Sequence, residues 1–328
     1  MHMKVGTKSP RHLVSMMELS NEELYSLVSK AEKFKSIVKS NNVKEQQALH
    51  NNLLGKLVAM LFTKRSTRTR ISTEGAASFF GAQPMFLGKD DIQLGVNESM
   101  YDTTKVISSM TSCIFARVDS HSQIQELCQH SSVPIINSLC DLYHPLQAIT
   151  DILSIKETFG RTKGLKLAWI GDANNVINDL SIASLRSGMS VSISIPKDIQ
   201  FDSKIATEAE KLATEQGVTF EIVNDPLVAL KDANVIVTDT WISMGQELEK
   251  VAKLKQFAGY QITQDMLKQG QVASNWKFMH CLPRHAEEVA DDVFYSDQSI
   301  VFEEAENRLY AAMAAIDGFV INKGDLLK

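Results

Sequence analysis

Cysteine is rare in this sequence, and its distribution argues against two classes of protein. Cys113, Cys128, Cys140 and Cys281 are the four cysteines among 328 residues, and they lack the short spacings that are typical of a zinc site. They are also too few for the disulfide framework of a small secreted domain. We therefore expect a reducing, intracellular compartment and no metal site.

The sequence also lacks a basic excess and a long apolar run. Lys and Arg number 34 against 39 Asp and Glu, a net charge of -5, so a nucleic-acid partner has no electrostatic support. No apolar run approaches the length of a membrane span, and the first residues contain no apolar signal core. The short N-terminus predicts a cytoplasmic protein, with the mitochondrial matrix as the alternative if a presequence has been removed.

What is present is the composition of an ordinary globular protein. The chain is 44% hydrophobic and 22% charged, and 328 residues are enough for two domains with their own cores. Apolar, strand-like runs alternate with helical patterns twice along the chain, which predicts an α/β protein with two parallel sheets flanked by helices. A helix from about residue 144 to 159 is the expected joint, and we find no internal repeat.

The apolar periodicity predicts the following elements. The strands are expected at residues 57–62, 84–87, 113–116, 133–137, 165–170, 190–195, 219–223, 234–238 and 277–280. The helices are expected at residues 20–39, 67–80, 100–110, 124–130, 144–159, 176–186, 203–216 and 303–321.

The most distinctive stretch is the polar turn at residues 63–70. It lies between an apolar strand and a helix that Ser66 is well placed to cap. Three arginines fall within six residues at this helix start, where the helix dipole disfavours cations. A bound anion would resolve the conflict, because the first-turn N–H groups, the hydroxyls and the forked guanidinium groups of Arg68 and Arg70 are all donors. The stretch predicts a phosphate site rather than an ordinary solvated helix start.

Arg117 and His144, like Arg68, follow the ends of predicted strands. In a parallel sheet ligands bind at the carboxyl ends of the strands, so one crevice is expected to collect all three side chains. Gln147 follows His144 at i, i+3, so both can face one ligand. A histidine that merely caps the helix is an equally good interpretation of His144 alone.

The second half of the chain offers weaker signals. Asp239 follows a buried strand and could bind an amine, although a turn with a capping Asp is commoner. Cys281 is either a reactive thiol or, more often at such a position, a small buried side chain. Arg308, one turn into the closing helix, could reach the crevice. The turn at residues 171–176 begins with a glycine but lacks the second and third glycines of a dinucleotide site, which favours a domain without a cofactor.

Taken in order, these motifs resemble those of the aspartate/ornithine carbamoyltransferase family over nearly the whole chain. Ser66-Thr67-Arg68-Thr69-Arg70 is similar to the family's carbamoyl-phosphate motif, and His144-Pro145-Leu146-Gln147 to its second motif. Residues 239–245 and 280–283 resemble the ornithine branch, in its eukaryotic, fungal form. The resemblance implies that residues 1–150 bind carbamoyl phosphate, with residues 305–328 packing back on them, and that residues 151–304 bind ornithine.

The activity that the resemblance implies is transfer of a carbamoyl group from carbamoyl phosphate to L-ornithine. The products would be L-citrulline and phosphate, in arginine biosynthesis or the urea cycle. A carbamoyltransferase for another acceptor, such as putrescine or aspartate, and an inactive anion-binding regulatory homologue are the alternatives. The resemblance also implies a homotrimer in which Gln93 reaches into a neighbouring subunit's site.

The site residues implied by the resemblance fall into three groups. Those expected to bind carbamoyl phosphate are Ser66, Thr67, Arg68, Thr69, Gln93, Arg117, His144, Gln147, Cys281, Leu282 and Arg308. Those expected to bind ornithine are Asn175, Asp239, Ser243 and Met244. The catalytic residues among them would be Arg68, Arg117, His144 and Cys281.

Overall fold

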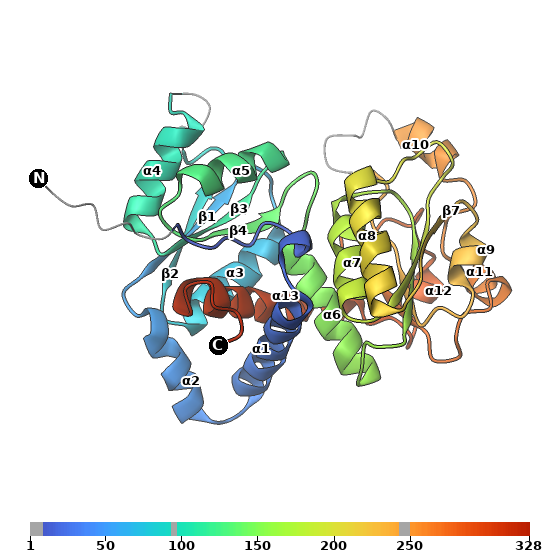
Figure 1. Ribbon diagram of the computed structural model, residues 1–328, viewed down its shortest axis with the longest axis horizontal. Coiled ribbons are helices and arrows are strands. Elements are labelled where there is room, and N and C mark those ends of the chain that lie inside the picture. The colour runs from blue at the N-terminus through green and yellow to red at the C-terminus, as the bar shows by residue number, and fades with distance from the viewer. Residues whose placement is uncertain (1–8, 93–96, 243–249) are drawn as a thin grey trace, which may run out of the picture. The chain divides into compact units, whose positions relative to one another are not determined.

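The computed structural model describes residues 9–92, 97–242 and 250–328 (Figure 1). The chain forms two compact units. The first contains the chain up to Glu18, Lys30–Leu146 and Leu309–Lys328, and the second contains Leu19–Ser29 and Gln147–Arg308. Three helices therefore begin in one unit and end in the other: α1 (Asn21–Lys39), α6 (Pro145–Phe159) and α13 (Val301–Ala315).

The first unit is built on a four-stranded parallel sheet of order β2-β1-β3-β4. Its strands are β1 (Leu57–Phe62), β2 (Gln83–Gly88), β3 (Cys113–Arg117) and β4 (Ile135–Leu139). The other elements of this unit are η1 (Met16–Glu18), α2 (Val43–His50), η2 (Asn51–Leu53), α3 (Thr67–Phe79), α4 (Met100–Met110), α5 (His121–His130) and η4 (Ile316–Ile321). The register pairs Phe62 with both Gly88 and Arg117, so three strands end at one level.

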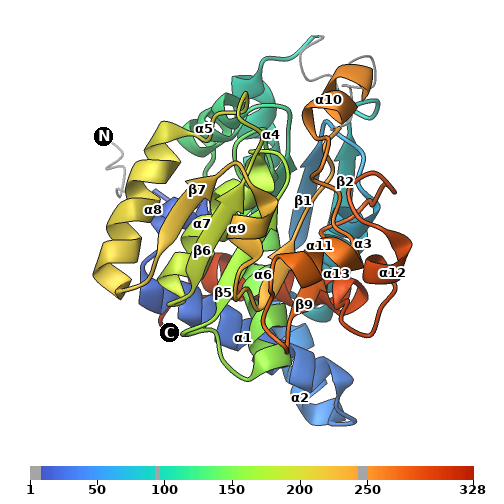
Figure 2. The ribbon, with the colours of Figure 1, turned by 90° about the vertical axis from the view of Figure 1, so that its right-hand side faces the viewer.

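The second unit is built on a five-stranded parallel sheet of order β7-β6-β5-β8-β9, visible in Figure 2. Its strands are β5 (Lys166–Ile170), β6 (Ser190–Ser194), β7 (Phe220–Val223), β8 (Val235–Val237) and β9 (Lys277–Met279). Its remaining helices are α7 (Asn175–Arg186), α8 (Ser203–Gln216), α9 (Pro226–Leu230), α10 (Lys250–Gln256), α11 (Gln264–Gln269) and α12 (Asp291–Phe294). The strand order reverses between β5 and β8, which is where such sheets bind ligands.

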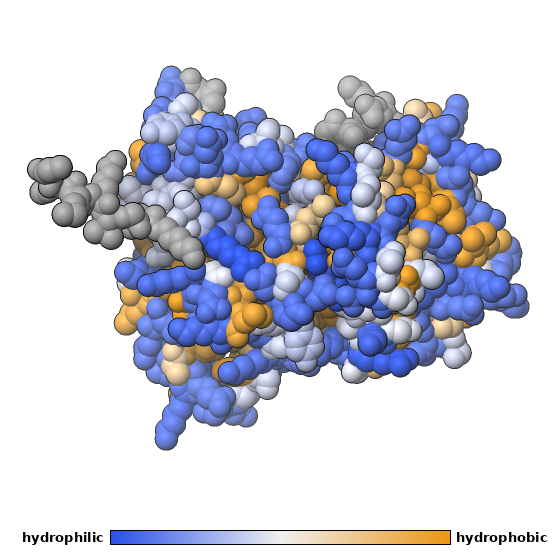
Figure 3. All heavy atoms as spheres, viewed as in Figure 1, coloured by the Kyte–Doolittle hydropathy of each residue, from blue (hydrophilic) through white to orange (hydrophobic). Residues whose placement is uncertain are grey.

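Local sequence explains the central elements of both sheets. β1 and β5 are apolar runs whose side chains are almost all buried, as expected of strands covered on both faces. Helix α7 begins at the Asn174 cap, whose side chain accepts from the N–H groups of Val176 and Ile177. On the face in Figure 3, hydrophilic residues predominate, in keeping with the composition. No helix among the described residues is long and apolar enough to cross a bilayer.

The structure confirms the predicted fold class and most of the predicted elements. The helices at residues 100–110 and 203–216 have the predicted bounds. The short helices α2, α9, α10, α11 and α12 were not predicted, because four to eight residues give too little periodicity. The closing helix was predicted to run to residue 321, but α-helical geometry ends at Ala315 and Ile316–Ile321 forms a π-helical segment.

Candidate functional site

The turn before α3 is a capped helix start, as predicted. Ser66 has an extended backbone (φ −163°, ψ 120°), and its Oγ accepts from the Thr69 N–H at 3.2 Å. The Ser66 hydroxyl also donates to Thr69 Oγ1 at 3.0 Å. These bonds hold two of the predicted phosphate-binding hydroxyls together at the start of the helix, whose first-turn N–H groups favour an anion.

The arginines of this turn have different surroundings. Arg70 Nε donates to Glu74 Oε1 at 2.8 Å, and its guanidinium lies 4.0 Å from the centre of the Phe86 ring. Arg65 is exposed, whereas Arg68 is half-buried. The sequence named both Arg68 and Arg70 as possible anion donors but assigned only Arg68 to the site, and the pairing of Arg70 with Glu74 agrees with leaving Arg70 out.

Arg117 is the last residue of β3, and His144 follows the end of β4. Both lie at the edge of the first sheet where β1 ends and the turn before α3 begins. Arg117 pairs with Phe62, and its carbonyl accepts from the Thr63 N–H at 2.9 Å. The β4 end is joined to β3 by the bond from the Val118 N–H to the Leu139 carbonyl, and His144 follows it just before α6. Both predicted side chains are buried, with 7% of Arg117 and 4% of His144 exposed. This edge of the first sheet thus carries the Arg117 guanidinium and the His144 imidazole, and His144 directly precedes α6.

Gln147 and Arg308 are in direct contact in the second unit. An Nη1–H of Arg308 donates to Gln147 Oε1. The Gln147 amide in turn donates to Asp151 Oδ1 at 2.7 Å and to Glu304 Oε1 at 2.9 Å. All four side chains are buried. Sequence reasoning missed Asp151 and Glu304, although each lies one helical turn from a predicted residue, which was the signal that could have found them.

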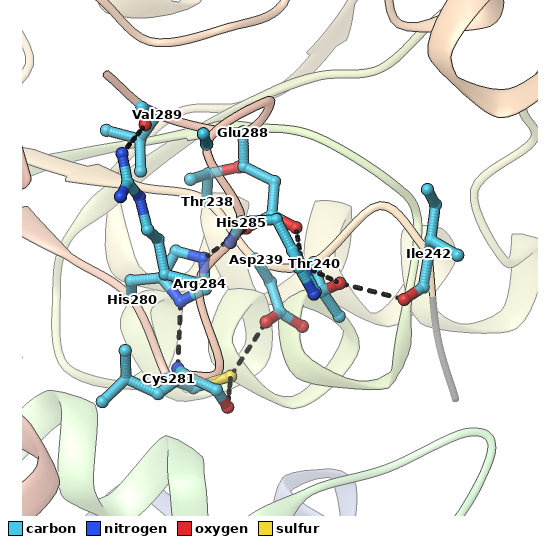
Figure 4. A network of polar contacts seen from close by, with 12 residues as sticks. Thr238, Asp239, Thr240, Ile242, His280, Cys281, Arg284, His285, Glu288 and Val289 are labelled. Carbon is cyan, nitrogen blue, oxygen red and sulfur yellow. Dashed lines mark hydrogen bonds and ion pairs between the residues drawn. The ribbon is translucent and has the colours of Figure 1, made fainter. Parts of the chain in front are cut away.

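Asp239 and Cys281 meet at the carboxyl ends of β8 and β9 (Figure 4). The Cys281 thiol donates to Asp239 Oδ1 at 3.0 Å. The Asn174 side-chain amide donates to Asp239 Oδ2 at 2.8 Å. Burial and the neighbouring Asp239 carboxylate raise the pKa of Cys281 well above its ordinary value, so the sulfur is a neutral thiol. The structure therefore joins two predicted residues, and it adds Asn174, which was not predicted, as a hydrogen-bond partner of Asp239.

The turn that follows β9 is held by Glu288. The His280 ring bonds through Nε2 to Glu288 Oε2 at 3.0 Å, while its Nδ1 accepts from the Leu282 N–H at 2.9 Å. This acceptor role places the His280 proton on Nε2. Glu288 also accepts from the backbone N–H and Nδ1 of His285, both at 2.9 Å (Figure 4). These contacts fix Leu282, whose φ of 62° is unusual for a branched residue.

Three of the predicted site residues, Gln93, Ser243 and Met244, lie outside the residues that the structure describes. Asn175 is the first residue of α7, and Thr67 the first of α3. Within the described ranges, no group of three His, Cys, Asp or Glu side chains is arranged to hold a metal ion.

Family models match both halves of the chain. The model of the carbamoyl-P binding domain of aspartate/ornithine carbamoyltransferases matches residues 11–157, and that of the Asp/Orn binding domain matches residues 163–318. The chain belongs to the aspartate/ornithine carbamoyltransferase family.

Similar proteins within this family include several from fungi. The mitochondrial ornithine transcarbamylase of Pachysolen tannophilus is 64% identical over 97% of this chain and 91% of its own length. The ornithine carbamoyltransferase of Saccharomyces cerevisiae is 62% identical over 97% of this chain and 96% of its own. The crystal structure of a mitochondrial ornithine carbamoyltransferase from Coccidioides immitis has a TM-score of 0.89 and 51% identity, covering 97% of this chain and 99% of that one.

Proposed function

We propose that this carbamoyltransferase transfers the carbamoyl group of carbamoyl phosphate to the side-chain amine of L-ornithine, giving L-citrulline and phosphate in arginine biosynthesis. The observation that carries the acceptor assignment is the buried Asp239 carboxylate, held by Cys281 and Asn174 at the strand ends of the second unit. A carboxylate attracts an ammonium group and repels an acceptor with a second carboxylate there. The names of the most similar fungal relatives agree with ornithine as the acceptor.

The phosphate of carbamoyl phosphate is bound at the start of α3. The hydroxyls and N–H groups of Ser66, Thr67 and Thr69 supply donors, and Arg68 supplies a permanently charged fork. The Ser66–Thr69 hydrogen bonds support this proposal because they fix two of the hydroxyls. The leaving phosphate keeps the same partners, so the site also stabilises the product of bond cleavage.

The carbamoyl group is bound by donors and acceptors of fixed orientation. Those assigned to it are Arg117, His144, Gln147, Cys281, Leu282 and Arg308. Attack of the amine builds negative charge on the carbamoyl oxygen, which preorganised donors such as Arg117 and His144 stabilise. Catalysis then depends on positioning and electrostatics, with direct transfer between the two substrates and no covalent enzyme intermediate.

Ornithine is bound by Asn175, Asp239, Ser243 and Met244. Its side-chain amine has an ordinary pKa of about 10 and is mostly protonated at neutral pH, so it must lose a proton before it attacks. Of these residues Asp239 has the clearest support, since its carboxylate is buried with 5% of its surface exposed.

The domain assignment is part of the proposal. Residues 1–150, with the C-terminal segment 305–328, form the carbamoyl-phosphate-binding domain, and residues 151–304 form the ornithine-binding domain. The two compact units and the two family-model matches support a division of this kind, although Leu19–Ser29 belongs to the second unit and the second family-model match extends to residue 318.

The active assembly is a homotrimer in which Gln93 of one subunit enters the site of the next. The exposed edge of the first sheet supports an assembly surface. β2 is an edge strand, and its Met85 is 39% exposed, while Ile71 on the neighbouring α3 is 66% exposed. Apolar side chains and an unpaired strand edge favour contact with another chain.

The names of the relatives bear on the compartment in which the protein works. We expected the cytoplasm from the sequence, with the mitochondrial matrix as the alternative. The relatives from Pachysolen tannophilus and Schizosaccharomyces pombe are named mitochondrial, which favours the alternative. Fractionation of cells that express the full-length gene with a C-terminal tag decides between the two compartments.

A citrulline-formation assay tests the proposed reaction. Purified protein is supplied with carbamoyl phosphate and, separately, ornithine, putrescine or aspartate, and the carbamoylated products are quantified by mass spectrometry. We expect rapid product formation with ornithine alone. A preference for putrescine or aspartate would establish a different acceptor, and tight binding of carbamoyl phosphate without any transfer would establish an inactive anion-binding homologue.

A further inference from the structure

Asp151 and Glu304 form a buried carboxyl pair beside Gln147. Asp151 lies on α6 and Glu304 on α13, and each is 1% exposed. Both accept a hydrogen bond from the Gln147 amide nitrogen, at 2.7 and 2.9 Å, so the two carboxyl groups lie side by side around one donor. Two acids are rarely buried together, since two carboxylates would repel each other and lose their hydration.

The contacts of Gln147 determine which way its amide faces. Arg308 has donors only, so the Gln147 atom that contacts it must be the carbonyl oxygen. The amide nitrogen must then face the carboxyl pair, which offers two acceptors. A flipped amide would bring N–H groups against the N–H groups of Arg308. The pair and Arg308 therefore allow one orientation, in which the carbonyl oxygen still has a second lone pair for a ligand.

Glu304 also reaches the strand end that carries Cys281. Its Oε2 accepts from the His280 N–H at 2.9 Å, while its Oε1 accepts from Gln147. One carboxyl group thus links the start of α6 to the turn that holds Cys281 and Leu282. Both ends of this link are residues to which the proposed function assigns the carbamoyl group.

The pair must retain a proton to hold this arrangement. Burial raises the pKa of Asp151 to about 7 and that of Glu304 well above its ordinary range, and the Asp151 charge raises the Glu304 value further. The other charged or titratable groups acting on the pair are Arg308, Asp239 and Cys281. At neutral pH the pair of carboxyl groups therefore keeps a proton, which lowers the repulsion between them.

We propose that Asp151 and Glu304 are positioning residues of the carbamoyl transfer. As a proton-sharing pair, they hold the Gln147 carbonyl as an acceptor for the amide N–H of the carbamoyl group, and they hold the turn at Cys281 at a fixed distance from it. This inference rests on the proposed function. It predicts that the pair contributes to recognition of the carbamoyl group and not to recognition of the phosphate.

Two ligands distinguish recognition of the carbamoyl group from recognition of the phosphate. Phosphonoacetamide is a stable analogue with both the amide and the phosphonate, and inorganic phosphate lacks the amide. Calorimetry measures the dissociation constants of both for the wild-type protein, Asp151→Leu and Asp151→Asn. Leucine removes the acceptor. Asparagine keeps the acceptor oxygen toward Gln147 and supplies its own N–H to Glu304 in place of the shared proton. Glu303→Gln, at an exposed neighbour of Glu304, is the control.

We expect Asp151→Leu to weaken phosphonoacetamide binding about 10-fold, the loss of one hydrogen bond between neutral groups, with phosphate binding unchanged. Asp151→Asn and the control are expected to stay within about threefold of the wild type, a difference of less than about 1 kcal/mol. Equal weakening of both ligands, or no weakening of phosphonoacetamide, would overturn the inference. If Asp151→Leu does not fold, Asp151→Ser replaces it, because its hydroxyl is too short to reach Gln147.

The wild-type protein distinguishes failure of this inference from failure of the proposed function. If the wild type forms no citrulline and binds phosphonoacetamide no better than phosphate, the proposed function is wrong and the inference falls with it. If the wild type forms citrulline and Asp151→Leu changes neither binding nor the KM for carbamoyl phosphate, only the inference is wrong.

Discussion

Arg68 and Arg70 are two residues apart on one helix start but differ in exposure, since Arg68 is half-buried and Arg70 is exposed. Arg70 pairs with Glu74 and lies on Phe86, and it is the matched control for Arg68. We expect Arg68→Ala to nearly abolish citrulline formation, because a planar, forked cation on the phosphate has no replacement there. Arg70→Ala should retain most of the activity.

Steady-state kinetics with varied carbamoyl phosphate, together with circular dichroism, tests this expectation. The KM for carbamoyl phosphate should rise first, with an intact fold in both variants. Normal turnover in Arg68→Ala would show that the phosphate binds elsewhere.

Asp239 is the residue on which we propose that acceptor choice depends. Asp239→Asn keeps the shape of the side chain but replaces one of the oxygens that accept from Cys281 and Asn174 with a donor. We expect kcat/KM for ornithine to fall by the equivalent of a charged hydrogen bond, about 2–3 kcal/mol. Binding of carbamoyl phosphate alone should barely change, and equilibrium binding supplies that control. The opposite pattern would mean that the two substrates have been assigned to the wrong domains.

At the scale of elements, the turn after β9 depends on one buried carboxylate. Glu288 accepts bonds from His280 and His285 (Figure 4). Burial raises its pKa, but these hydrogen bonds lower it more, so the net pKa lies below the ordinary value. A lowered pKa means that Glu288 stabilises the fold above the ordinary carboxyl pKa, about 4.3, and that this contribution disappears as the pH falls through the folded-state pKa.

We therefore expect Glu288→Gln to lower the free energy of unfolding by about 2–3 kcal/mol at neutral pH, because the amide offers only one acceptor to these donors. Chemical denaturation of both proteins across a pH series measures the difference, which should shrink below about pH 4. Asp297→Asn, an exposed carboxylate nearby in the sequence, is the control and should change little. If the stability difference stays constant down to acid pH, the negative charge of Glu288 is not its cause.

At the scale of the whole molecule, the proposed homotrimer predicts that two inactive variants complement each other. Arg68→Ala removes the phosphate ligand from a subunit's own site, and Gln93→Ala removes the residue that it lends to the next subunit. A mixed trimer contains some sites with both residues intact, so part of the citrulline-forming activity should return after subunit exchange. Mass spectrometry of intact assemblies confirms the exchange, and trimers that mix without regaining activity would contradict shared sites.

Local sequence determined those features whose physics is local. The apolar run at Leu57–Phe62, the Ser66 cap and the arginines beside it predicted a strand, a helix start and an anion site, since each depends on neighbouring residues only. The alternation of strands with helices is also visible along the sequence, and it predicted two parallel sheets. The catalytic interpretation needed more, because it came from the resemblance of ordered motifs to a known family.

The tertiary structure decided which polar groups meet. The strand order β5-β8-β9 brings Asp239, Cys281 and Asn174 together from positions up to 107 residues apart, and no local pattern encodes that pairing. Likewise, Gln147 faces Asp151 along its own helix, but Glu304 joins them only through packing of α13. Burial then changed the chemistry of these acids, because a carboxyl group removed from water keeps its proton more readily. The sequence by itself specified the residues and the longer helices and strands, whereas the packing set the partners of the polar groups and their charge.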